Sequence, residues 1–405
     1  MPPVERVSTD RCPGVLAVHQ AADGGLARVR LPGGLLTVEQ LGVLAAASAG
    51  LGDGNLELTS RANLQIRALR PGAPRTLSDR LYAAGLLPSI THERVRNILA
   101  SPLSGLDHNS LYDVLPAAAE LDRLLCDRPG LAELPGRFLF ALDDGRGDLS
   151  SARADVAVQV VSSELALLAL GGVVCGQTTL AEMPAVMVTA AEAFLVERAE
   201  QQSEAWRLAE LQDGPARVLK RLDVHESTGQ LQRAAPLVAG RYQQPDGQWA
   251  VVATVPLGSL RPEQASALAV VAARGAGQVR VTPWRSVVVA SLADAEDAVR
   301  RLQAVGLVVE PESPWNGVTA CAGRPGCAKA LADVRADAWR LTPTMAPGHR
   351  AVHWSGCERR CGRPNSDHLE VLAVSGGGYS VDGVPVDDLA SSLSPVRTAV
   401  RKARS

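Results

Sequence analysis

The stretch Leu56-Glu-Leu-Thr-Ser-Arg-Ala-Asn-Leu-Gln-Ile-Arg67 decides the fold, because its pattern occurs twice in the chain. Apolar and polar residues alternate along it, which predicts a strand hairpin. Ahead of it, residues 27–34 are predicted to form a strand and Thr37–Ala47 a helix. Thr37 and Gln40 have the spacing of a capping box at the start of that helix.

The same order of elements returns in the second half of the chain. A strand, a helix and a hairpin are predicted over residues 249–258, 262–269 and 279–290. Glu39-Gln40 is echoed by Glu263-Gln264, and each copy continues into a second helix with a matching end, at 81–86 and 302–307. A repeat this long that occurs twice is no solenoid, so we interpret the chain as a duplicated half-molecule.

Four cysteines near the carboxyl end form two close pairs, Cys321 with Cys327 and Cys357 with Cys361. A 4Fe-4S cluster needs four thiolates, and two short loops can supply them. A zinc site is an alternative, but the wider spacing of the first pair is unusual for zinc. Disulfides are a further alternative, which the lack of an apolar amino-terminal segment disfavours, because a reducing cytoplasm is then expected.

Composition excludes several functions for this chain of 405 residues and net charge −2. The length predicts about two to three domains. The chain lacks the excess of positive charge that is typical of proteins that bind nucleic acid. Its longest apolar stretch, 165–175, is too short to cross a bilayer. We therefore expect a cytoplasmic protein without nucleic-acid or membrane partners. No dinucleotide fingerprint is visible, so a separate electron donor is expected.

Corresponding loops of two related halves tend to face a shared ligand. Residues 95–105 of the first half correspond to 315–326 of the second, and 134–140 correspond to 353–357. One half offers arginines where the other offers thiols. We therefore expect a site with an iron–sulfur cluster on one wall and cations on the other.

The two half-repeats, the runs Thr59-Ser-Arg61-Ala-Asn-Leu-Gln65, Arg96-Asn-Ile98 and Leu134-Pro135, and the cysteine loops together resemble the nitrite/sulfite reductase family. The resemblance covers nearly the whole chain. It implies an α+β fold in which two ferredoxin-like half domains form a central domain flanked by two α+β lobes. The implied boundaries are 1–75 and 236–310 for the half domains, and 76–235 and 311–405 for the first lobe and the cluster-carrying second lobe.

The resemblance also implies a site. The 4Fe-4S cluster would be bound by Cys321, Cys327, Cys357 and Cys361, beside a tetrapyrrole pocket with the substrate-binding residues Arg61, Gln65, Arg96 and Arg137. The reductases typically have two lysines in an Arg-Lys-Phe-Lys run, where this chain has Gly136-Arg137-Phe138-Leu139. Arginine stays protonated and leucine carries no proton, so the departure disfavours proton-consuming reduction of sulfite or nitrite.

A second branch of this family, the precorrin-3B synthases, fits the departure better. That resemblance implies an oxygen-dependent monooxygenase of cobalamin biosynthesis, which hydroxylates precorrin-3A at C20 and closes a γ-lactone. The implied partners are precorrin-3A, dioxygen and a separate electron donor. Arginine pairs well with the peripheral carboxylates of such a substrate. A sirohaem-dependent sulfite or nitrite reductase is the alternative, and a non-enzymatic iron–sulfur or tetrapyrrole carrier is a third hypothesis.

The synthase resemblance adds a mononuclear non-haem iron as a candidate cofactor, but the sequence does not fix its ligands. His353 and His368 lie nearest to the cysteine loops. Asp107 with His108, and His92 with Glu93, are alternatives in the first half. A lone histidine is more often an ordinary surface or core residue, so none is assigned, and no catalytic residue is assigned either.

Overall fold

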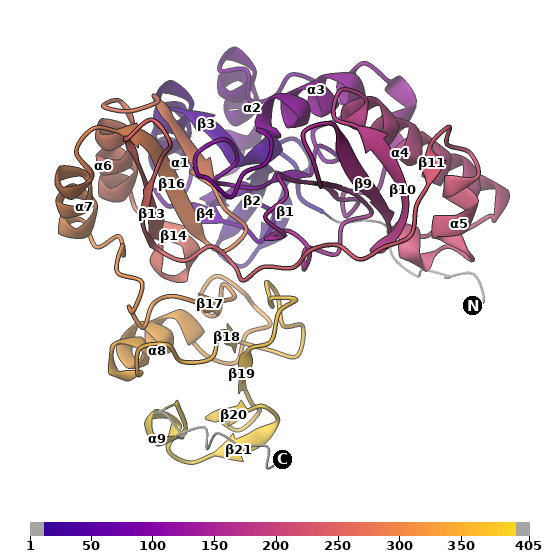
Figure 1. The fold of residues 1–405 in the computed structure, drawn as a ribbon. Helices are drawn as coiled ribbons and strands as arrows, with labels where there is room; N and C mark the ends of the chain where they lie inside the picture. Colours follow the sequence, from indigo (N-terminus) through magenta and orange to yellow (C-terminus); the bar gives the residue numbers. More distant parts are fainter. Residues whose placement is uncertain (1–11, 394–405) are drawn as a thin grey trace, which may run out of the picture.

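The computed structural model describes residues 12–393, which form four sheets (Figure 1). Two five-stranded sheets belong to the two half domains and lie side by side in the centre. A six-stranded sheet with its helices forms the first lobe, and another five-stranded sheet forms the second lobe, below the central sheets in Figure 1. The fold is therefore α+β and internally duplicated, as the sequence predicts.

Each half domain combines one sheet with two helices. The first has the strand order β1-β2-β5-β4-β14, with β1 (His19–Ala21), β2 (Gly24–Val29), β5 (Leu64–Leu69), β4 (Leu56–Leu58) and β14 (Ser259–Leu260), and helices α1 (Val38–Leu51) and α2 (Ala73–Ala83). The second has the order β12-β13-β16-β15-β3, with β12 (Gly240–Gln243), β13 (Trp249–Thr254), β16 (Ser286–Leu292), β15 (Gln278–Val281) and β3 (Leu35–Thr37), and helices α6 (Pro262–Ala272) and α7 (Ala295–Ala304).

The two half domains exchange one short strand each. β3 of the first half pairs antiparallel with β15 of the second, and β14 of the second half pairs antiparallel with β4 of the first. This exchange fuses the halves into one central domain. The alternation in the sequence predicts strands but not this exchange, because pairing between distant segments leaves no local pattern.

Gln40 and Gln264, at corresponding positions of the two halves, make the same hydrogen bonds. The side-chain oxygen of Gln40 accepts the backbone N–H of Thr37 at 3.1 Å, and that of Gln264 accepts the N–H of Arg261 at 2.9 Å. Each amide nitrogen then donates to a carbonyl oxygen just after the second helix, that of Ala84 in one half and Val305 in the other. The predicted capping box at Thr37 is confirmed.

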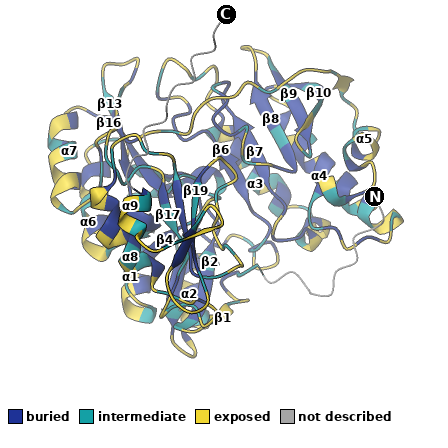
Figure 2. Ribbon diagram, turned by 90° about the horizontal axis from the view of Figure 1, so that it is seen from below, coloured by how far each residue is buried: buried dark blue, intermediate teal, exposed yellow. Residues whose placement is uncertain are grey.

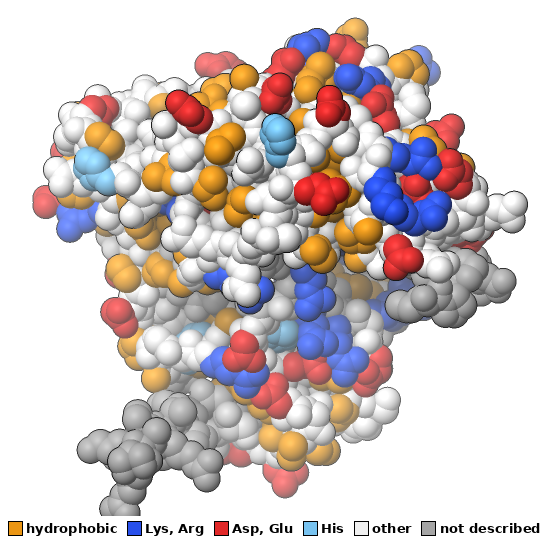
Figure 3. Space-filling model, turned by 45° about the vertical axis from the view of Figure 1, so that its right-hand side comes forward, with side chains coloured by type: hydrophobic (Ala, Val, Ile, Leu, Met, Phe, Trp, Pro, Cys, Tyr) orange, Lys and Arg blue, Asp and Glu red, His pale blue; other side chains and the backbone are white. Residues whose placement is uncertain are grey.

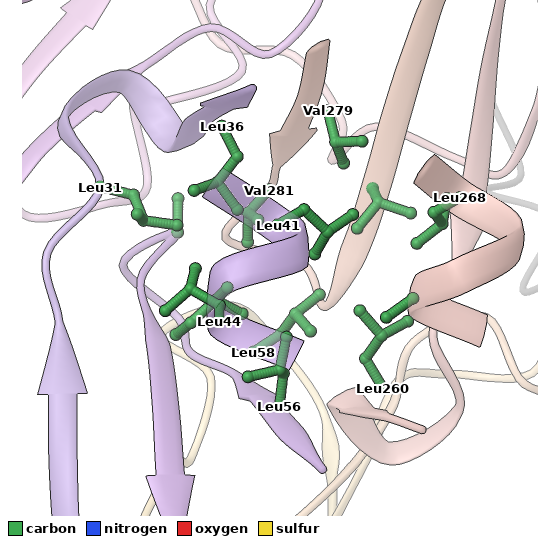
Figure 4. Close-up of a cluster of buried hydrophobic side chains, with 14 of the residues drawn as sticks. Leu31, Leu36, Leu41, Leu44, Leu56, Leu58, Leu260, Leu268, Val279 and Val281 are labelled. Carbon is green, nitrogen blue, oxygen red and sulfur yellow. The ribbon is translucent and has the colours of Figure 1, made fainter. Parts of the chain in front are cut away.

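One hydrophobic core runs through both half domains (Figure 4). Leu41 and Leu44 of α1 point into it from the first half, and Leu268 of α6 from the second. All three side chains are at most 2% exposed. Figure 2 shows the same division, with buried residues on the central sheets and exposed residues on the outer faces of the helices.

Gly34 sits where the exchanged strand β3 begins. Its φ is +73°, and a Cβ there would lie 2.2 Å from the carbonyl oxygen of Val281. We expect Gly34→Ala to lower the free energy of unfolding by at least about 2 kcal/mol, because it adds backbone strain and pushes the half domains apart. Urea denaturation measures the change.

Gly42 provides a matched control for that substitution. It lies within α1, and a Cβ there meets no atom within 4 Å. Gly42→Ala should raise the stability by about 0.5–1 kcal/mol, since alanine is the better helix former. Equal urea midpoints for the two variants would contradict the role given to Gly34.

The two lobes repeat one topology. The first has the strand order β11-β10-β9-β8-β7-β6, with β11 (His225–Glu226), β10 (Val173–Thr179), β9 (Leu165–Leu170), β8 (Val156–Val160), β7 (Phe140–Asp143) and β6 (Ile98–Ala100), and helices α3 (Leu115–Cys126), α4 (Met183–Glu200) and α5 (Gly214–Leu219). The second has the order β17-β18-β19-β20-β21, with β17 (Val318–Ala320), β18 (Val352–Ser355), β19 (Leu369–Ala373), β20 (Tyr379–Val381) and β21 (Val384–Val386), and helices α8 (Val334–Leu341) and α9 (Leu389–Leu393).

The strands of the two lobes also agree in direction. β6, β7 and β8 are mutually parallel, as are β17, β18 and β19, and antiparallel strands complete each sheet. The duplication therefore extends from the half domains into the lobes. The domain boundaries given above stay predictions. Within residues 12–393, no helix is long and apolar enough to span a membrane.

Candidate functional site

The cysteine loops leave the second lobe at one edge of its sheet. Cys321 directly follows β17, and Cys357 comes two residues after β18. Because β17 and β18 are parallel neighbours, both loops start at the same edge. Ligand-binding loops typically follow the carboxyl ends of parallel strands.

Hydrogen bonds join the two loops. The N–H of Cys321 donates to the carbonyl oxygen of Trp354 at 2.9 Å, and the N–H of Gly356 donates to Sγ of Cys321 at 3.2 Å. A Cβ on Gly356 would lie 2.8 Å from Cβ of Ala330, so only glycine fits this approach. An N–H directed at a cysteine sulfur stabilises a thiolate and is one way in which proteins tune iron–sulfur clusters.

The four thiols lie close enough to influence one another. Burial raises the pKa of Cys361, and the neighbouring Cys321, Cys357 and Cys327 act in the same direction. Four such thiols clustered in two loops fit a 4Fe-4S cluster, in which each iron takes one thiolate and the sulfurs stay apart. No three His, Cys, Asp or Glu side chains of the described residues converge on a single-ion site, so a lone zinc ion fits less well.

The first half domain holds the loop between Cys321 and Cys327 in place. Nη2 of Arg67, on β5, donates to the carbonyl oxygen of Gly326 at 2.9 Å. Asp23 orients the same guanidinium through two hydrogen bonds of 2.9 and 3.0 Å. The loop between Cys321 and Cys327 is thus fixed to the central domain as well as to its own lobe.

Arginines gather beside these loops. Burial lowers the pKa of Arg61 to about 10 and that of Arg285 to about 10, and the charge of Arg28 acts in the same direction on both. Arg30 responds in the same way, with a pKa lowered first by burial and next by Arg28. We call Arg28, Arg30, Arg61 and Arg285 the arginine cluster.

Arg285 connects the arginine cluster to the cysteine loops. A Cβ on Gly362 would lie 3.7 Å from Nη2 of Arg285, and Gly362 directly follows Cys361. Thiols and cations are therefore adjacent. Figure 3 shows basic side chains along the hollow between the second lobe and the rest of the molecule.

Arg30 is the most deeply buried member of the arginine cluster, with 2% of its surface exposed. Its Nη2 donates to the carbonyl oxygen of Arg94, whereas Nε and Nη1 have no hydrogen-bond partner among the described residues. Burying an unsatisfied cation among like charges costs stability, unless an anionic ligand compensates it. Arg30 therefore has the character of a residue that binds an anionic ligand.

Two of the predicted binding residues belong to this region. Gln65 pairs across the sheet with Arg28, and its amide oxygen, turned toward that guanidinium, accepts from Nη2 and Nε at 2.5 and 3.0 Å. Nη1 of Arg61 donates to the carbonyl oxygen of Gly136, at 3.2 Å. Arg61 and Gln65 are thus brought together around Arg28.

The other two predicted binding residues lie in different surroundings. Arg96 is buried and forms a bidentate ion pair with Asp122 of α3, at 2.6 and 2.7 Å. Its guanidinium is already neutralised, so the structure does not place Arg96 in the arginine cluster. Arg137 is exposed, and its guanidinium carbon lies 4.6 Å from the ring centre of Trp206, a cation–π contact.

Leu139 is the position at which the family resemblance implies a lysine in the reductases. Its side chain is 3% exposed and belongs to the core shared by the half domains. Its backbone N–H donates to the carboxylate of Asp155 at 2.9 Å. Position 139 therefore contributes packing, and it can neither bind an anion nor deliver a proton.

The histidine pair near the cysteine loops is buried. Nδ1 of His353 lies 2.8 Å from Oγ1 of Thr319, and Nδ1 of His368 lies 2.8 Å from the carbonyl oxygen of Ser366. Within residues 12–393, Nε2 of each ring has no hydrogen-bond partner, and the ring centres are 6.2 Å apart. Burial, Arg285 and His368 lower the pKa of His353 to about 3, so that ring is neutral.

Three of the four candidate iron ligands of the first half have structural partners, and the fourth, His108, is exposed. Asp107 pairs with Arg146, and Glu93 accepts backbone N–H groups of residues 15–17. Nε2 of His92 lies 3.0 Å from the carbonyl oxygen of Arg128. Since two histidines alone do not make an iron site, the described part of the chain does not fit a mononuclear iron.

Sequence reasoning missed Arg28, Arg30 and Arg285. The sequence did contain a signal for Arg28 and Arg30, because alternate residues of a strand share one face. Arg28 lies on β2, and Arg30 lies two residues later, just beyond the end of that strand. Arg285 left no such signal. Its backbone φ of +62° at the β15–β16 turn is set by the fold.

Comparisons with known proteins agree with this architecture. Residues 19–84 and 242–305 match the model of the nitrite/sulfite reductase ferredoxin-like half domain. The chain is similar to the NirA protein of Mycobacterium tuberculosis in structure, with a TM-score of 0.72, 22% identity, and coverage of 88% of this chain and 73% of that one. At that identity the likeness supports the fold alone.

Curated relatives include enzymes of two kinds. A precorrin-3B synthase of Sinorhizobium sp is 29% identical, over 92% of this chain and 82% of the relative. A ferredoxin–nitrite reductase of Synechococcus elongatus is 27% identical, over 89% and 79%, and a ferredoxin-type sulfite reductase of Mycolicibacterium paratuberculosis is 26% identical, over 89% and 72%. These relatives are oxidoreductase-type enzymes. Both half domains of the chain thus match the nitrite/sulfite reductase ferredoxin-like half domain, and the chain as a whole is similar to enzymes of two kinds.

Proposed function

We propose that the chain is a precorrin-3B synthase, which hydroxylates precorrin-3A at C20 with dioxygen and closes a γ-lactone. The observation that carries the proposal is the burial of Leu139 in the hydrophobic core. Reduction of sulfite or nitrite consumes many protons, and a buried leucine at this position cannot supply them. Oxidation of a carboxylate-rich tetrapyrrole makes no such demand on position 139.

The arginine cluster supports a tetrapyrrole substrate. Planar guanidinium groups form paired hydrogen bonds with carboxylates, and Arg30 offers two unpartnered N–H positions in a buried setting. Arg61 and Arg285 carry pKa values lowered by burial, so an anionic ligand would relieve an unfavourable arrangement. The proposed task of these residues is to bind and orient the peripheral carboxylates.

The four cysteines are the proposed ligands of a 4Fe-4S cluster, which supplies electrons one at a time when bound. One oxygen atom would enter the substrate and the other would leave as water, which consumes two electrons and two protons. The electrons would come from a separate donor. A mononuclear iron is not part of this proposal, because the described residues bring no ligand set together for it.

Turnover tests the proposal directly. Purified protein, a chemical reductant and anaerobically prepared precorrin-3A should give, after isotopically labelled dioxygen is admitted, a product heavier by one labelled oxygen atom. A product without label would rule out the monooxygenase reaction. Cluster binding without any turnover would instead favour a carrier.

The visible spectrum tests the alternative. A sirohaem reductase would show the intense absorption of a metallated tetrapyrrole and would consume nitrite or sulfite. The synthase proposal predicts cluster absorption alone and no consumption of either anion. Sirohaem in the purified protein, together with nitrite or sulfite turnover, would overturn it.

A further inference from the structure

A partly buried ion pair links the first half domain to the first cysteine loop. Nη1 and Nη2 of Arg335, on α8, donate to the two carboxylate oxygens of Glu57, on β4, at 2.7 and 2.6 Å. Nε of the same guanidinium donates to the carbonyl oxygen of Cys321, at 3.2 Å. Ser259 of the exchanged strand β14 donates to Glu57 as well, at 2.9 Å.

The positive charge of this guanidinium lies next to the first cysteine, because Nε is 3.2 Å from the carbonyl oxygen of Cys321. The two contacts with the Glu57 carboxylate are charge-assisted hydrogen bonds, which fix the guanidinium in this place. The side chains of Arg335 and Glu57 are 25% and 7% exposed, so solvent screens the pair only in part.

Among the described residues, the second half domain contains a contact that holds a loop without an ion pair. Arg280, on β15, occupies the position that corresponds to Glu57, because Arg280 pairs with Leu35 of β3 as Glu57 pairs with Ser259 of β14. Nη1 of Arg280 donates to the carbonyl oxygens of Pro102 and Ser104, in the loop that follows β6. A single arginine in the sheet is therefore enough to hold a loop of this kind.

At the cysteine loop the arrangement is reversed, with the carboxylate in the sheet and the guanidinium on the lobe. This reversal places the guanidinium on the same lobe as Cys321, with Nε on the carbonyl oxygen of that cysteine. We propose that Arg335, anchored by Glu57, is a positioning residue that holds the Cys321 loop and raises the reduction potential of the cluster. The inference rests on the cluster proposed above.

The effect on the potential follows from charge. Reduction adds an electron to a cluster that is already surrounded by thiolates, and a nearby cation favours the more negative state. Arg335→Gln removes the cation and leaves Glu57 unpaired, so the potential should shift to a more negative value. Arg335→Lys keeps the charge but cannot make all three hydrogen bonds, so its potential should stay closer to that of the wild type.

Anaerobic redox titration of the purified full chain, followed by cluster absorption or electron paramagnetic resonance, measures the shift. A second readout is the rate at which a chelator removes iron, which should rise roughly tenfold or more in both variants, because outer contacts of this kind hold ligands in place. Arg340→Gln is the matched control. Arg340 lies on α8 too, is exposed, and pairs with Asp337 alone.

The outcomes separate the two claims. A wild-type chain without iron and labile sulfide would overturn the cluster, and this role of Arg335 with it. A wild-type chain with a cluster, and an Arg335→Gln variant with unchanged potential and unchanged iron loss, would overturn the inference alone. If Arg335→Gln does not fold, Arg335→Lys decides, since wild-type iron loss in that variant would exclude a positioning role.

Discussion

A Cys361→Ser chain is expected to purify with less than about a tenth of the wild-type iron and acid-labile sulfide, because the cubane then lacks one of its four thiolates. Cys361 is the most exposed of the four cysteines, and its thiol is the one whose pKa responds to all three others. Serine keeps the size of the side chain. Loss of the cluster would therefore reflect lost ligation.

Cys175→Ser is the matched control. Cys175 lies on β10 in the first lobe, and its thiol donates to the carbonyl oxygen of Leu168 at 3.7 Å. Iron and sulfide should stay at the wild-type level in this variant. Full cluster content in Cys361→Ser, or equal losses in both variants, would contradict the ligand assignment.

The duplication could be predicted from the sequence because its evidence is local. The capping box of Thr37 and Gln40 needs only a three-residue spacing, and the helix ends at 81–86 and 302–307 are closed alike. Leu86 donates to Leu81 at 2.9 Å, and Leu307 donates to Leu302 at 3.0 Å. In each case the donor comes directly after a glycine with positive φ, Gly85 or Gly306. Both glycines can be recognised in the sequence.

The strand exchange could not be predicted in the same way. β3 and β14 have only three and two residues, and each pairs with a strand more than a hundred and fifty residues away along the chain. Nothing in three residues specifies such a partner. The glycines that precede them, Gly34 and Gly258, both have positive φ, but they indicate only a turn.

Some residues of the site could be predicted from local sequence and others could not. The cysteine pairs are recognisable because their spacing is local, whereas the arginines could be judged only in three dimensions. Arg96 and Arg61 look alike in sequence, but Asp122 of α3 neutralises Arg96 and no carboxylate is hydrogen-bonded to Arg61 among the contacts described. Whether a buried arginine serves the fold or a ligand depends on its partner, and the partner is non-local.

If the chain binds precorrin-3A as proposed, Arg61→Gln should weaken that binding by about 10- to 100-fold, because it would remove a charge-assisted contact to a carboxylate in a buried site. The same substitution should raise the stability of the ligand-free protein. Burial, Arg207 and Arg28 lower the pKa of Arg61 to about 10. The charged guanidinium is therefore less favourable in the folded state than in the unfolded state, and it lowers the free energy of unfolding near neutral pH. Quenching of tryptophan fluorescence measures the affinity, and urea denaturation measures the stability.

The combination of weaker binding and higher stability distinguishes a binding residue from a structural one. Arg123→Gln is the control, because Arg123 is exposed on α3 and pairs with Glu120 and Asp127, so it should change neither quantity appreciably. If Arg61 served the fold, as Arg96 does with Asp122, its substitution would lower the stability. Lower stability with unchanged affinity in Arg61→Gln would therefore remove Arg61 from the site and leave the arginine cluster without its proposed ligand.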